Sequence, residues 1–363
     1  MGKKILTLEV APSPTIIPQA TFAPTVAEQP TISIVAQNLE IPWSLVFLSD
    51  KSVLFTERPG RVRFISADGS LDPKPVAVIA DVYANGEGGL LGIEADPQFG
   101  KNKLIYLCYS YNSKGRMLNK VVQYEFVNRQ LIKPKVIVDE IPGNSNHDGG
   151  RIKFGPDGYL YITTGDSQDP SLAQNKLSTA GKILRVTRDG RPAPGNPFGT
   201  LVYSYGHRNP QGLTWDDKGR LWATEHGRSI PFSGFDELNL IEKGKNYGWP
   251  TIQGDEKASD MVTPVLNSGA TTTWAPSGVA FYLSRSNQSS VFFGGLKGQG
   301  LYEAVINGTK VTLKKHFDQE LGRIRDVVLG PDNMLYITTS NRDGRGDPKT
   351  GDDKILRLNP GKL

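Results

Sequence analysis

The stretch IKFGPDGYLYITT (152–164) contains the pattern that decides the fold. A few apolar residues precede a Pro-Asp-Gly turn, and an apolar and aromatic run that ends in two threonines follows it. Proline and glycine suit the dihedral angles of a tight turn, whereas β-branched and aromatic residues favour extended backbone. The stretch therefore predicts two antiparallel strands joined by a short turn.

The same pattern recurs along the chain. The other copies are at 213–225 and 327–339, which are the clearest, at 43–57 and 92–106, and at 279–294, which is weaker. A third strand follows each copy, at 61–65, 121–126, 182–186, 237–240, 301–305 and 354–358. Repeats of roughly 40–60 residues are typical of propeller blades. We therefore predict an all-β, six-bladed β-propeller, and the regular repeat argues against the alternative of a large β-sandwich.

The two ends of the chain carry separate signals. An extra strand at 31–36 is expected to complete the last blade and close the ring. Residues 11–30 are rich in Pro, Thr and Ala, so we predict a flexible segment over 1–30 and a catalytic propeller domain over 31–363. The segment is either a disordered tail or a stalk that remains after removal of a signal or lipid-attachment region. The second interpretation predicts an extracytoplasmic protein: periplasmic, secreted or attached to the cell surface.

Composition narrows the class of protein. The chain of 363 residues is 37% hydrophobic and 22% charged, which is typical of a packed soluble core. Its net charge is +5, but the Lys and Arg residues form no dense run, which argues against nucleic-acid binding. No apolar run is long enough to cross a bilayer. The single cysteine, Cys108, excludes a disulfide framework and is expected to be a buried thiol.

His147 is the first candidate catalytic residue. It lies in NHDGGR (146–151), a glycine-lined turn directly before a strand, and GHRNPQG (206–212) is built alike. Because loops of successive blades converge on one face of a propeller, these two loops are expected to share a pocket. A neutral imidazole is a ready general base at pH 7. A three-histidine metal site is the rival interpretation, but no HxH or HExxH spacing supports it.

Charged residues gather in the same kind of loop. Arg323 and Arg325 are two positions apart at a strand start, so their side chains are expected to share a face and suit a carboxylate ligand. Solvated surface arginines are the equally weighted alternative. Oxygen-rich loops at 225–228, 236–237 and 343–353 offer ligands that calcium prefers, without the spacing of an EF-hand.

Six segments together resemble the soluble, pyrroloquinoline quinone (PQQ)-dependent aldose and glucose dehydrogenases of the glucose/sorbosone dehydrogenase family. They are EGGLLG (87–92), NHDGGR (146–151), GHRNPQG (206–212), ELN with NYGWP (237–239 and 246–250), GLK (295–297) and RIRDV (323–327). The resemblance covers the chain from about Leu39 to its C-terminus. It implies a six-bladed propeller, which agrees with the repeat count.

The resemblance also implies an activity. The protein would oxidise aldose sugars at C1 to lactones by hydride transfer to the C5 carbonyl of PQQ, and electrons would pass to an external acceptor. His147 would take the proton of the anomeric hydroxyl, and Arg208 would stabilise the developing oxyanion. The residues that would hold PQQ are Glu87, His147, Arg208, Asn209, Gln211, Lys297, Arg323 and Arg325. A monomer or homodimer is expected, with no nucleic-acid partner.

Calcium is the second cofactor that the resemblance implies. The backbone carbonyls of Gly227 and Arg228 would bind an ion that polarises the quinone, and a second calcium ion is expected near Gln253 and Asp255. Trp274 is either a platform for a sugar face or a core residue, with equal weight.

The chain departs from the glucose-specific members of the family at three places. It has Asn146 in place of Asp, Glu87-Gly88 in place of Gln-Asn, and Arg228 in place of Pro. These differences favour a broader aldose dehydrogenase. A propeller lactonase that uses calcium and His147 to activate water is the alternative enzyme. A non-catalytic propeller that binds carbohydrate or protein is the third possibility.

Overall fold

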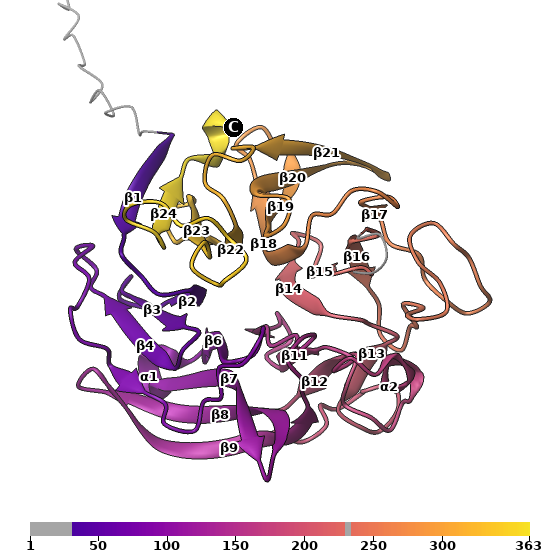
Figure 1. The fold of residues 1–363 in the computed structure, drawn as a ribbon, viewed down its shortest axis with the longest axis horizontal. Helices are drawn as coiled ribbons and strands as arrows, with labels where there is room; N and C mark the ends of the chain where they lie inside the picture. The colour runs from indigo at the N-terminus through magenta and orange to yellow at the C-terminus, as the bar shows by residue number, and fades with distance from the viewer. Residues whose placement is uncertain (1–30, 229–233) are drawn as a thin grey trace, which may run out of the picture.

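The computed structural model describes residues 31–228 and 234–363. Within these ranges the chain forms six four-stranded antiparallel sheets arranged in a ring around a central axis (Figure 1). The prediction of an all-β, six-bladed β-propeller is therefore confirmed. The predicted flexible segment at 1–30 lies outside the described residues. No helix in the described ranges is long and apolar enough to span a membrane.

Each blade uses strands that are consecutive in the chain, except the last. The first three blades contain β2 (Pro42–Phe47), β3 (Val53–Glu57), β4 (Arg61–Ile65) and β5 (Ala77–Val78); β6 (Leu90–Ala95), β7 (Leu104–Ser113), β8 (Arg116–Val127) and β9 (Gln130–Pro142); and β10 (Ile152–Phe154), β11 (Leu160–Thr164), β12 (Lys182–Val186) and β13 (Val202–Tyr205). The next two contain β14 (Pro210–Trp215), β15 (Leu221–Glu225), β16 (Glu237–Ile241) and β17 (Leu266–Asn267); and β18 (Pro276–Leu283), β19 (Ser289–Gly295), β20 (Gly300–Asn307) and β21 (Lys310–His316).

The last blade is built from both ends of the described chain. It contains β22 (Ile324–Leu329), β23 (Leu335–Thr339), β24 (Ile355–Leu358) and, at its outer edge, β1 (Ile32–Ala36). β1 pairs antiparallel with β24, with Ile32 opposite Leu358 (Figure 1). The predicted ring closure is confirmed, and it ties the two ends of the propeller together with backbone hydrogen bonds.

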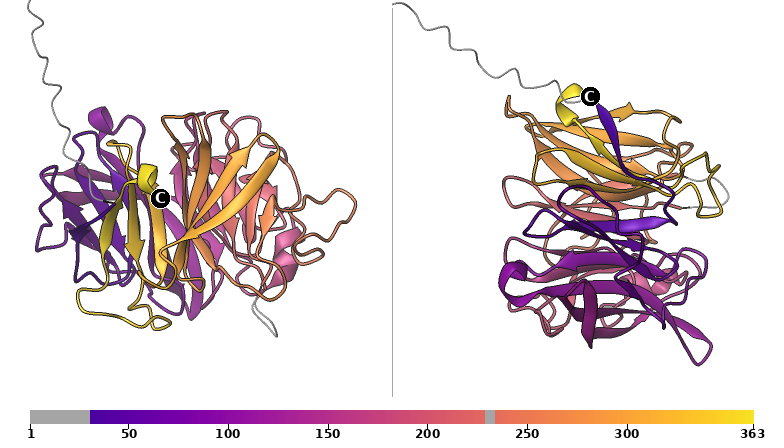
Figure 2. Two further views of the ribbon diagram at one scale, coloured as in Figure 1. Left: turned by 90° about the horizontal axis from the view of Figure 1, so that it is seen from above. Right: turned by 90° about the vertical axis from the view of Figure 1, so that its left-hand side faces the viewer.

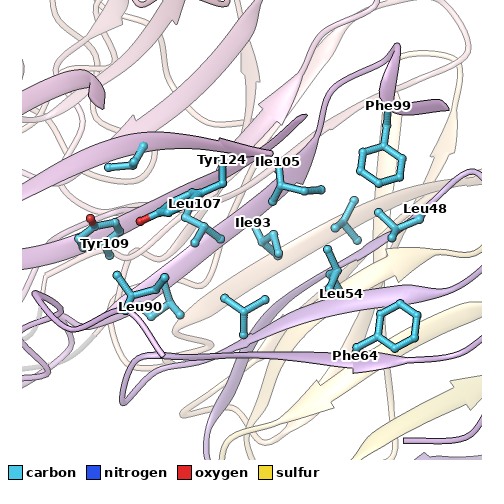
Figure 3. Close-up of a cluster of buried hydrophobic side chains, with 14 residues drawn as sticks. Leu48, Leu54, Phe64, Leu90, Ile93, Phe99, Ile105, Leu107, Tyr109 and Tyr124 are labelled. Carbon is cyan, nitrogen blue, oxygen red and sulfur yellow. The ribbon is translucent and has the colours of Figure 1, made fainter. Parts of the chain in front are cut away.

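Apolar side chains between adjacent blades form the core. Figure 2 shows the ring from the side, and Figure 3 shows the cluster between the first two blades, to which Leu54, Leu90, Ile93 and Leu107 contribute. Fully burying one such side chain contributes about 1.5–3 kcal/mol. Cys108 is buried in the next cluster, as predicted. The short helices α1 (Phe99–Asn102) and α2 (Pro170–Gln174) lie in connections between strands, and η1 (Pro360–Lys362) follows β24.

The innermost strands place the loops that matter for function. β6, β10, β14, β18 and β22 contact one another around the axis, and each begins just after a loop that carries a predicted site residue. A register shift interrupts the pairing near the start of β2, β6, β14, β18 and β22. Such a bulge redirects side chains at the end of a sheet. The ring therefore gathers five loops at one end of its axis.

Candidate active site

His147 is held by a carboxylate that the sequence did not identify. Its Nδ1 lies 2.7 Å from an Oδ of Asp166, and the indole Nε1 of Trp249 donates to the other oxygen of the same carboxylate at 2.8 Å. His147 itself has a φ of 65°, and a side chain on the neighbouring Gly165 would collide with its carbonyl oxygen. When Nδ1 donates its proton to Asp166, Nε2 keeps a lone pair. The arrangement thus presents His147 as a proton acceptor of fixed orientation.

Glu87 connects the histidine loop to the axis. One carboxylate oxygen accepts the backbone N–H of His147 at 3.2 Å and Asn209 Nδ2 at 3.4 Å, and the other accepts Arg345 Nη1 at 2.6 Å. Burial by itself raises the pKa of this carboxyl, but His226 and Arg345 lower it to about 2. Glu87 is therefore ionised at neutral pH and joins three loops.

A cavity of about 330 Å³ lies beside Glu87 at this end of the axis. The predicted site residues that line it are Glu87, Gln211, Gly227, Arg228, Lys297, Arg323 and Arg325. His226, Asp236 and Arg345 also line it, and so do the small residues Thr273 and Ala275 and the apolar Leu296. We call this space the cationic cavity, because five of its lining side chains are Lys or Arg and two are carboxylates.

Arg323 and Arg325 reach the cationic cavity from the same strand start, as predicted from their spacing. Nε of Arg323 donates to Asp343 at 2.9 Å, and a guanidinium nitrogen of Arg325 lies 3.8 Å from the same carboxylate oxygen. Both guanidinium groups are buried, so the alternative of solvated surface arginines is wrong. Burial raises the pKa of Asp343, but the two arginines outweigh it and hold that pKa below its usual range.

Arg325 is the more strongly desolvated of the two. It donates to the side-chain oxygen of Gln211 at 2.6 Å, and burial lowers its pKa to about 9. Its Nε has no hydrogen-bond partner among the described residues. Lys297, by contrast, is exposed at the rim of the cationic cavity. A buried donor without a partner and an exposed ammonium group beside it are what an anionic ligand would satisfy.

His226 also lines the cationic cavity, although it was not among the predicted site residues. Burial lowers its pKa to about 3, an effect that nearby Arg325 reinforces and Glu87 opposes, so its ring is neutral at pH 7. Its Nε2 is buried and has no partner within the described ranges. His226 therefore adds a second unsatisfied polar atom to the wall.

Arg208 and Asn209 lie behind the wall of the cationic cavity rather than on it. The backbone N–H of Arg208 donates to Glu225, and the other oxygen of that carboxylate lies 2.8 Å from Nδ1 of the fully buried His207. The guanidinium group packs over the ring of Trp249 at 5.3 Å, which places it next to the residue that holds Asp166. His207 thus positions the Arg208 loop and has no access to a ligand.

The predicted calcium ligands are only partly brought together. Gly227 and Arg228 line the cationic cavity, and a Cβ on Gly227 would collide with the backbone at Gly234 and Phe235. Gln253 lies in a small adjoining pocket, and its buried Oε1 has no partner among the described residues, whereas the carboxylate of Asp255 accepts from Asn267 at 2.9 Å. The described ranges contain no group of three or more His, Cys, Asp or Glu side chains that could hold a metal. Calcium would therefore rely on backbone carbonyls and on oxygen atoms of a cofactor.

Trp274 is a core residue, so the prediction that it forms a sugar platform is wrong. Only 5% of it is exposed, and its ring packs 5.5 Å from Phe293 and 5.7 Å from Tyr302. Its neighbours Thr273 and Ala275 line the cationic cavity, whereas Trp274 points into the space between blades. These three residues lie in the loop before β18, and one step along that loop separates the cavity wall from the core.

One of the missed residues, Asp166, carries a signal in the repeats. Asp166 lies two residues after the end of β11. Gly227 and Asn341 occupy the equivalent position in other blades, two residues after β15 and β23. Comparing the repeats at this position would have drawn attention to Asp166. Trp249 and Arg345 carry no such signal, because long connections bring them to the axis.

The fold and the site together define a β-propeller with a cationic hub, one wall residue of which, Glu87, binds the backbone of a carboxylate-bound histidine. The family model for Glucose / Sorbosone dehydrogenase matches residues 39–356, and the chain therefore belongs to this family. Aldose sugar dehydrogenase YliI of Escherichia coli (strain K12) is 34% identical, over 86% of this chain and 91% of its own length.

Two solved structures are also similar. An oxidoreductase of Thermus thermophilus, described as a glucose dehydrogenase, is 41% identical with a TM-score of 0.84 and covers 90% of this chain and 99% of its own. The PQQ-bound aldose sugar dehydrogenase of Streptomyces coelicolor is 39% identical with a TM-score of 0.82 and covers 90% of this chain and 97% of its own.

Proposed function

We propose that the chain is a PQQ- and calcium-dependent dehydrogenase that oxidises aldose sugars at C1 to lactones and passes the electrons to an external acceptor. The observation that carries this proposal is the pairing of His147 with Asp166 in a loop whose backbone is bound by Glu87, a residue of the cationic cavity wall. A base of fixed orientation and a set of buried cations are together suited to a reaction on an anionic cofactor. Family membership supports the same activity.

The cationic cavity fits the chemistry of PQQ. When bound, PQQ supplies a quinone carbonyl that accepts the hydride, and calcium supplies a Lewis acid at that carbonyl. Lys297, Arg323 and Arg325 would bind its carboxylate groups, and the unsatisfied Nε of Arg325 offers one donor for this purpose. Gln211 fixes Arg325 from the side, so the guanidinium group is oriented before the ligand arrives.

Proton removal falls to His147. Its Nε2 would accept the proton of the anomeric hydroxyl while Asp166 stabilises the imidazolium ion that forms. Trp249 holds Asp166 in place, and Glu87 holds the backbone of His147. Burial lowers the pKa of Arg208, and its guanidinium group, packed over Trp249 beside Asp166, would stabilise negative charge that develops near His147.

The carbonyls of Gly227 and Arg228 are the calcium ligands that this chain would contribute. The carbonyl of Arg228 accepts the N–H of Gly234 at 3.2 Å, which fixes the direction of that carbonyl. Gln253 is the stronger of the two candidates for a second ion, because its buried oxygen lacks a partner among the described residues. From the composition of residues 11–30 we also propose an extracytoplasmic location.

Reconstitution tests the proposal. PQQ and Ca²⁺ are titrated into the purified chain, and the absorbance of PQQ is followed before and after an aldose is added. We expect saturable binding, a spectral change on addition of aldose, and lactone formation that requires an artificial electron acceptor. Failure to bind PQQ together with hydrolysis of sugar lactones would instead establish the lactonase alternative.

A further inference from the structure

A second, larger cavity lies next to the histidine loop. Its volume is about 590 Å³, and its lining residues are Tyr83, Asn85, Asn112, Gly115, Arg116, Met117, Leu118, Glu140, Pro142, Gly143, Asn144 and Ser145. We call it the hairpin cavity, because residues 112 and 115–118 belong to the hairpin of β7 and β8. None of the residues assigned above to catalysis, PQQ or calcium lines it.

The hairpin rises beside the candidate active site. Leu90, at the start of β6, pairs with Tyr109 of β7, and β7 continues to Ser113 before the chain turns back into β8. The four residues of β7 after Tyr109 (110–113) extend the strand by about 13 Å, at roughly 3.3 Å per residue. Since Leu90 follows the Glu87 loop directly, this extension stands at the same end of the ring as the cationic cavity.

The base and the hairpin cavity share one loop. β9 ends at Pro142, and the chain then passes through Gly143, Asn144 and Ser145, which line the cavity, to His147. Two residues of extended chain span at most about 7 Å, so His147 lies close to the cavity wall. A sugar with C1 at His147 therefore has this cavity within reach of its next unit.

The walls of the hairpin cavity are fixed in place without a ligand. The backbone N–H of Tyr83 donates to Ser110 at 2.8 Å, and that of Glu87 donates to Ser145 at 2.8 Å. Beneath the floor, the buried Asp148 accepts Asn119 Nδ2 at 3.0 Å and the backbone N–H of Asn144 at 3.2 Å. Binding to a preformed wall requires little further ordering.

The side chains suit a neutral saccharide. Tyr83 is 39% exposed and offers a ring for the apolar face of a sugar, and three exposed amides, those of Asn85, Asn112 and Asn144, can bond to hydroxyl groups. Arg116 and Glu140 carry opposite charges, so the lining is balanced and gives an acidic sugar no advantage. The charge distinguishes this cavity from the cationic cavity beside it.

We propose that the hairpin cavity is a subsite for the second sugar unit of a neutral oligosaccharide whose reducing end is oxidised at His147. This inference rests on the proposed function and extends it from aldoses in general to reducing oligosaccharides. Tyr83 and Asn112 determine the preference for longer substrates and take no part in the chemistry at C1.

The first test compares substrates of increasing length. The PQQ- and Ca²⁺-loaded protein is assayed with glucose, with maltose and maltotriose, and with cellobiose and cellotriose. We expect kcat/KM to rise at least fivefold from glucose to the oligosaccharides of one linkage. The Tyr83→Ala/Asn112→Ala double variant should lose that gain and keep its kcat/KM for glucose within twofold. Asn307→Ala, an exposed substitution on another blade, is the matched control.

A second measurement separates the subsite from the activity. Maltotriitol and cellotriitol have no anomeric hydroxyl to oxidise, and their binding to the cofactor-free protein is followed by ligand-observed NMR. Binding that the double variant abolishes supports the subsite even if no aldose is oxidised. Glucose oxidation with no gain from chain length and no binding of either alditol would overturn the subsite and leave the proposed function standing.

Discussion

The two cavities on the axis of the ring differ in what builds them. The cationic cavity is lined mainly by loops and by the first residues of inner strands, such as Lys297 and Arg325. A smaller cavity of about 180 Å³ lies further along the same strands. It is lined by apolar residues and by two pairs of side chains, each with one acid and one base: Arg151 with Asp326, and Lys153 with Glu94. The hydrogen bond from Arg151 Nε to the carbonyl of Gln211, 3.0 Å long, joins the two.

The difference shows how a propeller separates stability from function. Inward side chains from the middle of the strands pair their charges with each other, as Arg151 does with Asp326 at 3.1 Å. At the loop end, cations outnumber carboxylates, and the buried Nε of Arg325 and Nε2 of His226 lack partners among the described residues. In the smaller cavity Nη2 of Arg151 also lacks a partner there, but the charge of this guanidinium group is paired with Asp326. The smaller cavity is electrostatically balanced by itself, whereas the cationic cavity is balanced only by a ligand.

The largest expected effect comes from the base that borders the cationic cavity. We expect His147→Asn to lower kcat by about 10²–10⁴-fold, because a general base typically contributes that much. Asparagine tolerates the left-handed φ of 65° at this position. PQQ affinity, measured by absorbance titration, should stay within a few fold. Wild-type turnover in this variant would assign the proton transfer to another group.

The next effect concerns the cations themselves. Replacing Arg323 and Arg325 together by Ala should weaken PQQ binding by about 100-fold or more, since hydrogen bonds to charged groups contribute about 1.5–3 kcal/mol each. The control is Lys153→Met, which removes a cation from the smaller axial cavity and should leave PQQ affinity unchanged. Equal losses in both variants would contradict the division between the two cavities.

The smallest effect is on stability and belongs to the balanced cavity. Burial raises the pKa of Glu94 from 4.5 to about 7, despite Lys153 nearby. Between these values the folded state keeps a proton that the unfolded state has lost, so the free energy of unfolding falls as pH rises through this window. Relative to Glu94→Gln, the wild type should lose about 2–3 kcal/mol between pH 4.5 and pH 7 in urea unfolding.

The same pH series can also contradict the prediction for Glu94. If the wild type and Glu94→Gln show parallel pH profiles, Glu94 has the same pKa in the folded and unfolded states, and the small cavity is more hydrated than its lining indicates. Turnover with an aldose should be the same for both proteins, because Glu94 does not line the cationic cavity.

Repeats and motifs in the sequence were sufficient to predict the blades and the loops. The pattern of 152–164 recurs because each blade needs the same turn and the same alternating strand, so every copy predicts its own strands from local chemistry. The strand at 31–36 could be assigned to the last blade because a ring has one open edge to fill. The alternation of Arg323 and Arg325 likewise gave their common direction.

Contacts between distant loops could not be predicted in this way. Trp249 reaches Asp166 across 83 positions of the chain, and Arg345 reaches Glu87 across 258. Neither pair has a local pattern, because the path of two long connections decides whether the side chains meet. The hairpin cavity was not predicted either, because the alternation of residues in β7 and β8 does not show how far the two strands extend past β6.

The sequence by itself determined the number of blades, the closure of the ring and the loops that carry His147 and the arginines, because strand and turn preferences act between near neighbours in the chain. Only the tertiary structure decided that Asp166 and Trp249 orient the base, that Trp274 belongs to the core and that a second cavity opens beside the first. These outcomes depend on how six sheets stack around an axis, and stacking brings together side chains whose separation in sequence carries no information about their distance in space.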